Sequence, residues 1–246
     1  MKLSILIFSI AFLPFTVLLA DRVVASWDFS QVETPLEDLA GAYDLSNMGG
    51  VTFDRSQGAL FNGGPVDHLR VDYSEALEPW SVREGETWQL VLTGLKVNST
   101  GGYRAIYSSR DDAGEGAVLY INKGVLMFWV GDGHGDWNRL EGGSVYRGHT
   151  YNLIAGWDGQ SMYLTVDDGA TKHTTSLVPD AVAFNSGLKG VNSAIYFGVG
   201  GHGGGDKYQF RGHLKSAKIV YIPEASNFAL LLGLASVVVV FVRRQA

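Results

Sequence analysis

The clearest alternation of apolar and polar residues runs through residues 151–167. Every second position is apolar on either side of Asp158-Gly159, at Tyr151, Leu153, Ala155 and Trp157 and then at Met162, Leu164 and Val166. Asp-Gly between two such runs is typical of a two-residue type I′ turn, which pairs Leu153 with Leu164 on one face. A three-residue loop would put them on opposite faces, whereas a four-residue loop stays possible. The pattern predicts a hairpin whose apolar face a second sheet covers.

The pattern of apolar and polar residues predicts further strands along the chain. We expect a strand over Thr87–Val97 that is apolar on both faces and therefore central, with Trp88, Leu90 and Leu92 on one face and Leu95 and Val97 on the other. A second hairpin is expected around Asn122-Lys123-Gly124, from segments 117–121 and 125–130. Shorter strands are expected at 26–29, 59–61, 69–71, 103–109, 194–199, 210–214 and 217–221. No apolar repeat of helical period lies between the two terminal segments, so the pattern predicts one all-β sandwich.

The N-terminal segment has the features of a signal peptide. Lys2 precedes an apolar run over residues 3–20, and Val23-Val24-Ala25 places small residues where signal peptidase cuts. We therefore expect an N-terminal signal helix within a signal peptide of residues 1–25. Leu18-Leu19-Ala20 is a second possible site, and an uncleaved membrane anchor is the alternative.

The C-terminal segment, residues 222–246, combines Pro223-Glu224, an uncharged stretch over 228–242 and Arg243-Arg244. A helix over 228–242 would reach about 22 Å, short of the ~30 Å hydrocarbon core of a bilayer. We expect this apolar transmembrane helix to be a marginal anchor, oriented by arginines on the cytoplasmic side. This order of features resembles the PEP-CTERM sorting signal that exosortases process, with Ala225 replacing a second proline. A simple tail anchor remains the alternative.

Composition narrows the possible partners. The chain of 246 residues has no cysteine and a formal net charge of −6. It contains no basic stripe, which argues against nucleic acid and anionic lipid surfaces as partners. Without disulfides, an exported domain of this kind depends on its hydrophobic core.

Several short blocks across residues 26–221 resemble laminin-G-like domains. They are Trp157-Asp158-Gly159, the segment from Leu164 to Gly169, Leu60-Phe61-Asn62-Gly63 and Phe210-Arg211-Gly212-His213-Leu214. The resemblance implies a concanavalin A-like jelly-roll β-sandwich. It also allows a calcium ion at a loop of the sandwich without placing one.

The first candidate site is the loop Asp132-Gly133-His134-Gly135-Asp136, followed by Trp137. Two carboxylates, carbonyls freed by glycine and a neighbouring ring fit a calcium-assisted sugar site, because Ca²⁺ takes six to eight oxygen ligands. If Asp132 and Asp136 converge, their repulsion requires a cation. The alternative is a polar turn in which glycine supplies positive φ and aspartate caps the bend.

Aromatic and histidine side chains supply the other candidates. Trp137 and Trp80 lie in polar contexts that suit sugar stacking, whereas parity places Trp88 and Trp157 in the core. His134 and His202 lie in glycine-rich loops, and two histidines without a third ligand make a weak zinc site. Partial burial of the tryptophans and simple solvation of the histidines are the alternatives.

Catalytic motifs are missing from the sequence. The Glu-x-Asp-x-x-Glu strand of laminarinase-type hydrolases, which share the sandwich, does not occur. The sequence therefore predicts an exported, non-catalytic recognition or adhesion protein that binds a polysaccharide or surface glycan. It would be cut by signal peptidase and an exosortase-type enzyme, anchored transiently in the inner membrane, and delivered to the cell surface or matrix. The alternatives are a structural matrix component with protein partners and, third, a polysaccharide hydrolase.

Overall fold

The computed structural model describes residues 22–41, 43–71, 87–110, 116–182, 194–200 and 208–222, all within the unit Asp21–Glu224. These residues form 16 strands and no helix. The strands are β1 (Arg22–Asp28), β2 (Ser46–Asn47), β3 (Thr52–Asp54), β4 (Gly58–Phe61), β5 (Leu69–Val71), β6 (Thr87–Val97), β7 (Tyr103–Ser108), β8 (Ala117–Asn122), β9 (Val125–Gly131), β10 (Trp137–Ser144), β11 (Thr150–Trp157), β12 (Met162–Asp167), β13 (Lys172–Leu177), β14 (Ile195–Phe197), β15 (Gly212–Leu214) and β16 (Ser216–Ile222).

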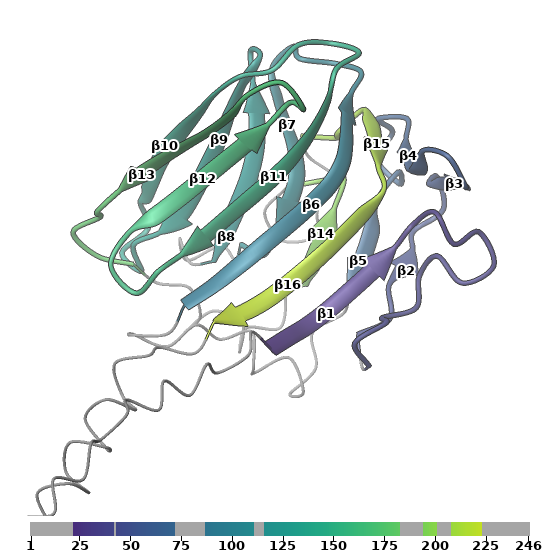
Figure 1. Ribbon diagram of the computed structural model, residues 1–246, viewed down its shortest axis with the longest axis horizontal. Coiled ribbons are helices and arrows are strands. Elements are labelled where there is room, and N and C mark those ends of the chain that lie inside the picture. Colours follow the sequence, from purple (N-terminus) through teal and green to yellow (C-terminus); the bar gives the residue numbers. More distant parts are fainter. Residues whose placement is uncertain are drawn as a thin grey trace, which may run out of the picture. The chain divides into compact units, whose positions relative to one another are not determined.

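The strands form two antiparallel sheets that lie face to face (Figure 1). Sheet A has nine strands in the order β13-β12-β11-β6-β15-β4-β3, with β16 also paired to β6 and β1 paired to β16. Sheet B has seven strands in the order β10-β9-β8-β7-β14-β5-β2. The predicted all-β sandwich is thereby confirmed.

The core lies between the sheets and is closed by aromatic side chains from both. Trp88 of sheet A meets Phe128 of sheet B edge to face, with ring centroids 6.1 Å apart. Trp27 of sheet A meets Phe197 of sheet B at 5.5 Å. Such pairs stabilise beyond the area they bury. Trp88 and Trp157 are both buried, as parity predicted.

In the hairpin over residues 151–167, the residues predicted to face the core do so, but the turn differs from the predicted one. Trp157 pairs with Met162 and Ala155 with Leu164, so residues 158–161 form a four-residue loop. The two-residue type I′ turn is therefore wrong. Asp158 explains the longer loop: its N–H donates to the Ser161 carbonyl at 3.1 Å, and its Oδ1 accepts from the Ser161 N–H at 2.6 Å.

A two-residue turn of the expected kind occurs in the β8–β9 hairpin. Asn122 pairs with Val125, and the turn residues Lys123 and Gly124 have φ values of 50° and 81°. Positive φ at both central residues defines the type I′ turn. The hairpin predicted around Asn122-Lys123-Gly124 is thus confirmed.

Strand β6 is central, as predicted, but for a different reason. A bulge at Gly94, with φ of 64°, shifts the alternation so that Leu95 and Val97 join Leu92 on the core face. The Asn152 side chain accepts a hydrogen bond from the Gly94 N–H at 3.0 Å. The apolar residues assigned to two faces therefore lie mostly on one, which corrects the sequence interpretation.

Other differences concern the ends of strands and the strands that the sequence analysis missed. Strand β1 begins at Arg22, and Ala25 within it is buried and paired with Ile219. Strands β2, β3, β10 and β13 were not expected. Strands β2 and β3 are very short, β10 has the buried Gly142 in place of an apolar side chain, and the side chains of β13 are mostly exposed.

Several predictions lie outside the described residues. They are Trp80, His202, the terminal helices and the sorting-signal residues Pro223, Glu224, Arg243 and Arg244. Within the part of the chain that is described, no helix is long and apolar enough to cross a membrane.

Candidate functional site

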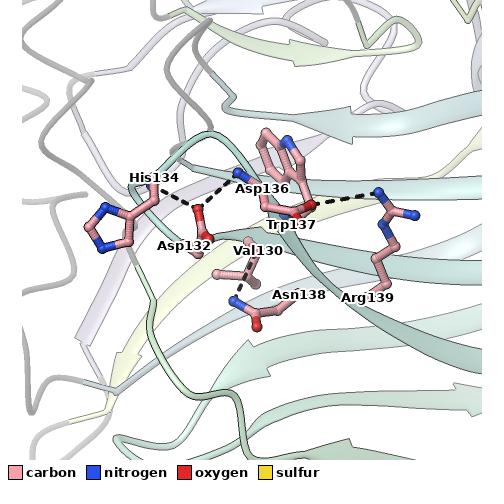
Figure 2. A network of polar contacts seen from close by, with 7 residues as sticks. All are labelled: Val130, Asp132, His134, Asp136, Trp137, Asn138 and Arg139. Atoms are coloured by element: carbon pink, nitrogen blue, oxygen red, sulfur yellow. Dashed lines mark hydrogen bonds and ion pairs between the residues drawn. The ribbon is translucent and has the colours of Figure 1, made fainter.

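The loop between β9 and β10 is an ordered polar turn (Figure 2). Asp132 Oδ1 accepts hydrogen bonds from the N–H groups of His134 at 2.8 Å and Asp136 at 3.0 Å. The Asp132 N–H donates to the Asp136 carbonyl at 3.1 Å, while Gly133 and Gly135 have φ values of 77° and 96°. The backbone hydrogen bonds from His134 and Asp136 lower the pKa of Asp132. This is the geometry of the alternative proposed from the sequence, an aspartate-capped glycine turn.

The carboxylates of Asp132 and Asp136 have different partners in this loop. Asp136 Oδ1 accepts from the Trp137 N–H at 2.8 Å and lies 3.8 Å from Arg139 Nη2. Across the described ranges, no group of three or more His, Cys, Asp or Glu side chains could hold a metal ion. These hydrogen bonds hold the loop in its turn.

Trp137 is not a loop residue, as the sequence suggested, but the first residue of β10. Its half-buried ring lies on the outer face of sheet B, 6.4 Å from the ring of Trp129. Asn138 is the next residue, and its Nδ2 donates to the Val130 carbonyl at 3.4 Å (Figure 2). Strand β10 therefore places the Trp137 ring in a packed aromatic surface.

That surface holds five rings, which we call the aromatic cluster: Tyr103, Tyr120, Trp129, Trp137 and Tyr208. The rings come from β7, β8, β9 and β10 and from the segment before β15. Tyr103 contacts Tyr120, Trp129 and Tyr208 at centroid distances of 5.6, 5.8 and 5.5 Å. Tyr120 is buried beneath its neighbours, whereas Tyr103 and Tyr208 are 36% and 37% exposed. The outermost rings therefore offer aromatic surface to a ligand.

Two arginines, Arg110 and Arg139, border the aromatic cluster. The Arg110 guanidinium carbon lies 5.0 Å from the centre of the Trp137 ring, and its Nη1 donates to the Tyr120 hydroxyl at 3.1 Å. Arg139 covers the Trp129 ring at 4.5 Å. Burial raises the pKa of Tyr120, partly offset by Arg110, so its hydroxyl stays protonated at neutral pH.

The backbone at Tyr208 is in an unusual conformation for a side chain of this size. Its φ is 60°, in the left-handed region that costs a non-glycine residue about 1–2 kcal/mol. The Tyr208 carbonyl accepts a hydrogen bond from the Ala105 N–H at 2.7 Å, which holds the segment against β7. Gly200 packs so closely on Ala105 that no side chain would fit there. Strained backbone of this kind is concentrated at ligand sites.

Of the residues proposed from the sequence, the structure brings Asp136 and Trp137 to the aromatic cluster. His134 lies exposed on the adjoining loop. Trp129, Tyr120 and Tyr103 were missed. A signal existed for two of them, since Trp129 and Tyr120 alternate with the core residues Phe128 and Leu119 and so face away from the core. No sequence pattern indicated that Tyr208 joins them.

Comparison with known proteins shows the fold. No protein-family model matches the chain, and no curated protein matches it. The chain is similar to the receptor-binding domain of botulinum neurotoxin C/D mosaic serotype, at 14% identity and a TM-score of 0.58, over 85% of this chain and 50% of that one. It is likewise similar to the binding domain of Paraclostridial Mosquitocidal Protein 1, at 16% and 0.58, over 85% and 51%.

A third similar structure is the ligand-binding domain of botulinum neurotoxin serotype D in complex with N-acetylneuraminic acid. It shares 13% identity at a TM-score of 0.55, over 85% of this chain and 50% of that one. The chain thus spans about half the length of these structures. At such low identity the likeness shows a two-sheet β-sandwich, and it does not assign the bound sugar to the matched half.

Proposed function

We propose that the protein is a non-catalytic glycan-recognition protein that binds sugar on the aromatic cluster. The observation that carries this proposal is the gathering of five aromatic rings on the outer face of sheet B, with Tyr103 and Tyr208 partly exposed. The C–H faces of a sugar ring stack on such surfaces, while bordering polar groups bind its hydroxyls.

The similar structures give indirect support. One is a complex with N-acetylneuraminic acid. Another, at a TM-score of 0.51, comes from botulinum neurotoxin type C, whose cell entry depends on interaction with two ganglioside molecules. The fold is therefore compatible with glycan recognition, and their description as binding domains fits a protein without catalytic motifs.

A glycan array with the purified protein tests the proposal. We expect Tyr103→Ala to remove most of the signal seen with the unaltered protein. Tyr146→Ala is the matched control, because Tyr146 is 62% exposed and its ring packs on His149 instead of the aromatic cluster. An array without bound glycans, or a signal that Tyr103→Ala leaves intact, contradicts the proposal.

Export and surface delivery form the second part of the proposal, supported by the apolar terminal segments and the PEP-CTERM-like ending. The protein would be a laminin-G-like surface protein, cut by signal peptidase and an exosortase-type enzyme. Because β1 includes Arg22 and the buried Ala25, we propose cleavage after Ala20 in place of Ala25. The N-terminal sequence of the surface-exposed protein should begin at Asp21. A start at Ser26 would contradict this, as would recovery of residues 228–242 in the inner membrane only.

Calcium at residues 132–136 remains a separate proposal, supported by the two carboxylates. A melting curve recorded with millimolar calcium tests it, because a cation that binds only the folded state raises the melting temperature. A rise that disappears in Asp132→Asn with Asp136→Asn would support the site. An unchanged melt would leave the aspartate-capped turn as the complete account.

The second candidate function is structural assembly through protein partners. Strand β13 lies at the edge of sheet A with mostly exposed side chains. Its last residue, Leu177, is 37% exposed, and Val178, which follows the strand, is 62% exposed. Exposed edges pair readily with other strands. Analytical ultracentrifugation distinguishes the two functions, since concentration-dependent polymers that Val178→Lys abolishes would favour assembly.

A further inference from the structure

We propose that the aromatic cluster selects neutral sugars, whose adjacent hydroxyl groups bind Asp136 and Arg139 together. The inference rests on the proposed glycan recognition and names the class of ligand. It is carried by the contact between this one carboxylate and one guanidinium (Figure 2) and by the position of Arg139 over the Trp129 ring.

Arg139 is held in place by its neighbours on the sheet. It lies directly across from Trp129 in the pairing of β10 with β9, and its guanidinium carbon is 4.5 Å from the centre of that ring. On its other side, Nη2 lies 3.8 Å from Asp136 Oδ1. A stacked, paired guanidinium presents its remaining N–H donors in a fixed direction.

Both members of this pair remain open to a ligand. The side chains of Arg139 and Asp136 are 55% and 82% exposed. An exposed ion pair at this separation contributes little stability by itself. Carboxylate and guanidinium groups are therefore available to make hydrogen bonds with a bound molecule.

The chemistry of the pair matches two neighbouring hydroxyls. A guanidinium only donates hydrogen bonds and an ionised carboxylate only accepts them, whereas a hydroxyl does both. One hydroxyl can donate to Asp136 while the next accepts from Arg139, and the sugar ring then lies toward the aromatic cluster. Neutral sugars carry such adjacent hydroxyls.

The charges around the site disfavour an acidic sugar. Both bordering arginines already have partners: Arg110 binds the Tyr120 hydroxyl and Arg139 the Asp136 carboxylate. The exposed Glu141 lies opposite Met127 on the same face as Arg139. The chain as a whole carries a net charge of −6. A ligand carboxylate would thus displace Asp136 and then face like charges, which is unfavourable.

The first experiment compares sugars that differ in charge. Calorimetry with the purified full-length protein would use lactose against 3′-sialyllactose, and methyl-esterified tetragalacturonate against the free acid. We expect the neutral member of each pair to bind at least about tenfold more tightly, given the cost of like charges at an interface. Tighter binding of either acidic member overturns the inference, as does failure of both neutral probes to bind.

The second experiment uses variants of the pair. Because hydrogen bonds to charged groups are being removed, Asp136→Ala and Arg139→Met should each weaken binding of the neutral probes by about tenfold. Methionine keeps an aliphatic cover over Trp129, and unchanged melting curves verify that both variants fold. Glu141→Gln, an exposed change on the same strand, should leave the affinity unaltered.

The outcomes separate this inference from the proposed function. Suppose that the neutral probes bind, that Tyr103→Ala abolishes this binding, and that Asp136→Ala and Arg139→Met leave it unchanged. Glycan recognition by the aromatic cluster then stands, and the role of Asp136 and Arg139 is refuted. If neither these probes nor any array glycan binds, the proposed function itself fails.

Discussion

The two faces of sheet B use the same strands for different purposes. On the inner face of β8 and β9, Leu119, Ile121, Leu126, Phe128 and Val130 are fully buried against sheet A. On the outer face the alternate positions carry rings and charges. Trp129 contacts both Tyr120 and Arg139 there, and the outermost rings are partly exposed. In β8 and β9 alternation sets which face a side chain points to, whereas the residue type decides whether that face is purely apolar or also carries polar groups.

The physical basis of the difference between the two faces is the polar atom that each of these outer residues carries. Inner side chains are purely apolar, so burial is their whole contribution. Tyr120 and Trp129 combine apolar area with a hydroxyl or an indole N–H, and arginine covers rings while keeping its charge in water. The outer face can therefore stay partly solvated and bind a polar ligand. The following changes test that contrast, from the largest expected effect to the smallest.

Phe128→Ala should have the largest effect on stability. The residue is fully buried and packs edge to face on Trp88, so the free energy of unfolding should fall by about 3–5 kcal/mol. Tyr103→Ala on the outer face should cost clearly less, because that side chain is 36% exposed. Urea denaturation measures both, and equal losses would show that the outer face is as much a core as the inner one.

Arg110→Met should have an intermediate effect. It removes the hydrogen bond to the Tyr120 hydroxyl and the stacking on Trp137, which together contribute about 1–3 kcal/mol at a buried position. Arg139→Met is the matched control, since its exposed pair with Asp136 should contribute less than about 1 kcal/mol. If the melting temperature falls more in Arg139→Met than in Arg110→Met, then Arg139 and not Arg110 is the main support of the aromatic cluster.

Tyr208→Gly should change stability little and binding greatly. Glycine relieves the positive φ of 60° but loses the contacts with Tyr103 and Tyr120, so the net change should be below about 1 kcal/mol. Glycan binding should be lost with the exposed ring. Lys123→Gly is the control, because Lys123 also has positive φ and lies in the β8–β9 turn outside the cluster. Retained binding in Tyr208→Gly would remove this residue from the site.

Asp132→Asn should have the smallest effect, visible only in acid. The folded state holds the pKa of Asp132 below its ordinary value of 3.8, because the carboxylate accepts backbone hydrogen bonds from His134 and Asp136. The carboxylate therefore contributes stability above that value, which is lost as the pH falls toward the folded pKa. Between pH 5 and pH 3 the melting temperature of the variant should fall less than that of the unaltered protein. Asp168→Asn, at a similar exposed turn with a lowered pKa, should behave alike.

Much of the fold could be predicted from the sequence. The alternation in residues 151–167 correctly assigns Leu153, Leu164 and Trp157 to the core, because a period of two is the direct imprint of a half-buried strand. The turn Lys123-Gly124 was equally clear, since few residues accept positive φ at two successive positions.

Where the sequence analysis failed, a specific side-chain hydrogen bond decided the backbone geometry. Asn152 binds the bulge at Gly94, and this contact moves Leu95 and Val97 onto the core face of β6. The hydrogen bond that the Ser161 N–H donates to Asp158 Oδ1 favours a four-residue loop over the turn that Asp-Gly predicts. Local propensity is a weak guide where such contacts compete with it.

The sequence by itself determined which side chains of residues 151–167 face inward and that Asp136 and Trp137 are neighbours after the strand that ends near Val130. Only the tertiary structure decided that Trp137, Trp129, Tyr120, Tyr103 and Tyr208 form one surface. Four adjacent strands bring four of these rings together, and the Ala105–Tyr208 hydrogen bond adds a fifth from about a hundred residues away. Strand order and backbone pairing decide which residues meet on the outer face of a sheet. The local alternation of apolar and polar residues predicts neither of them.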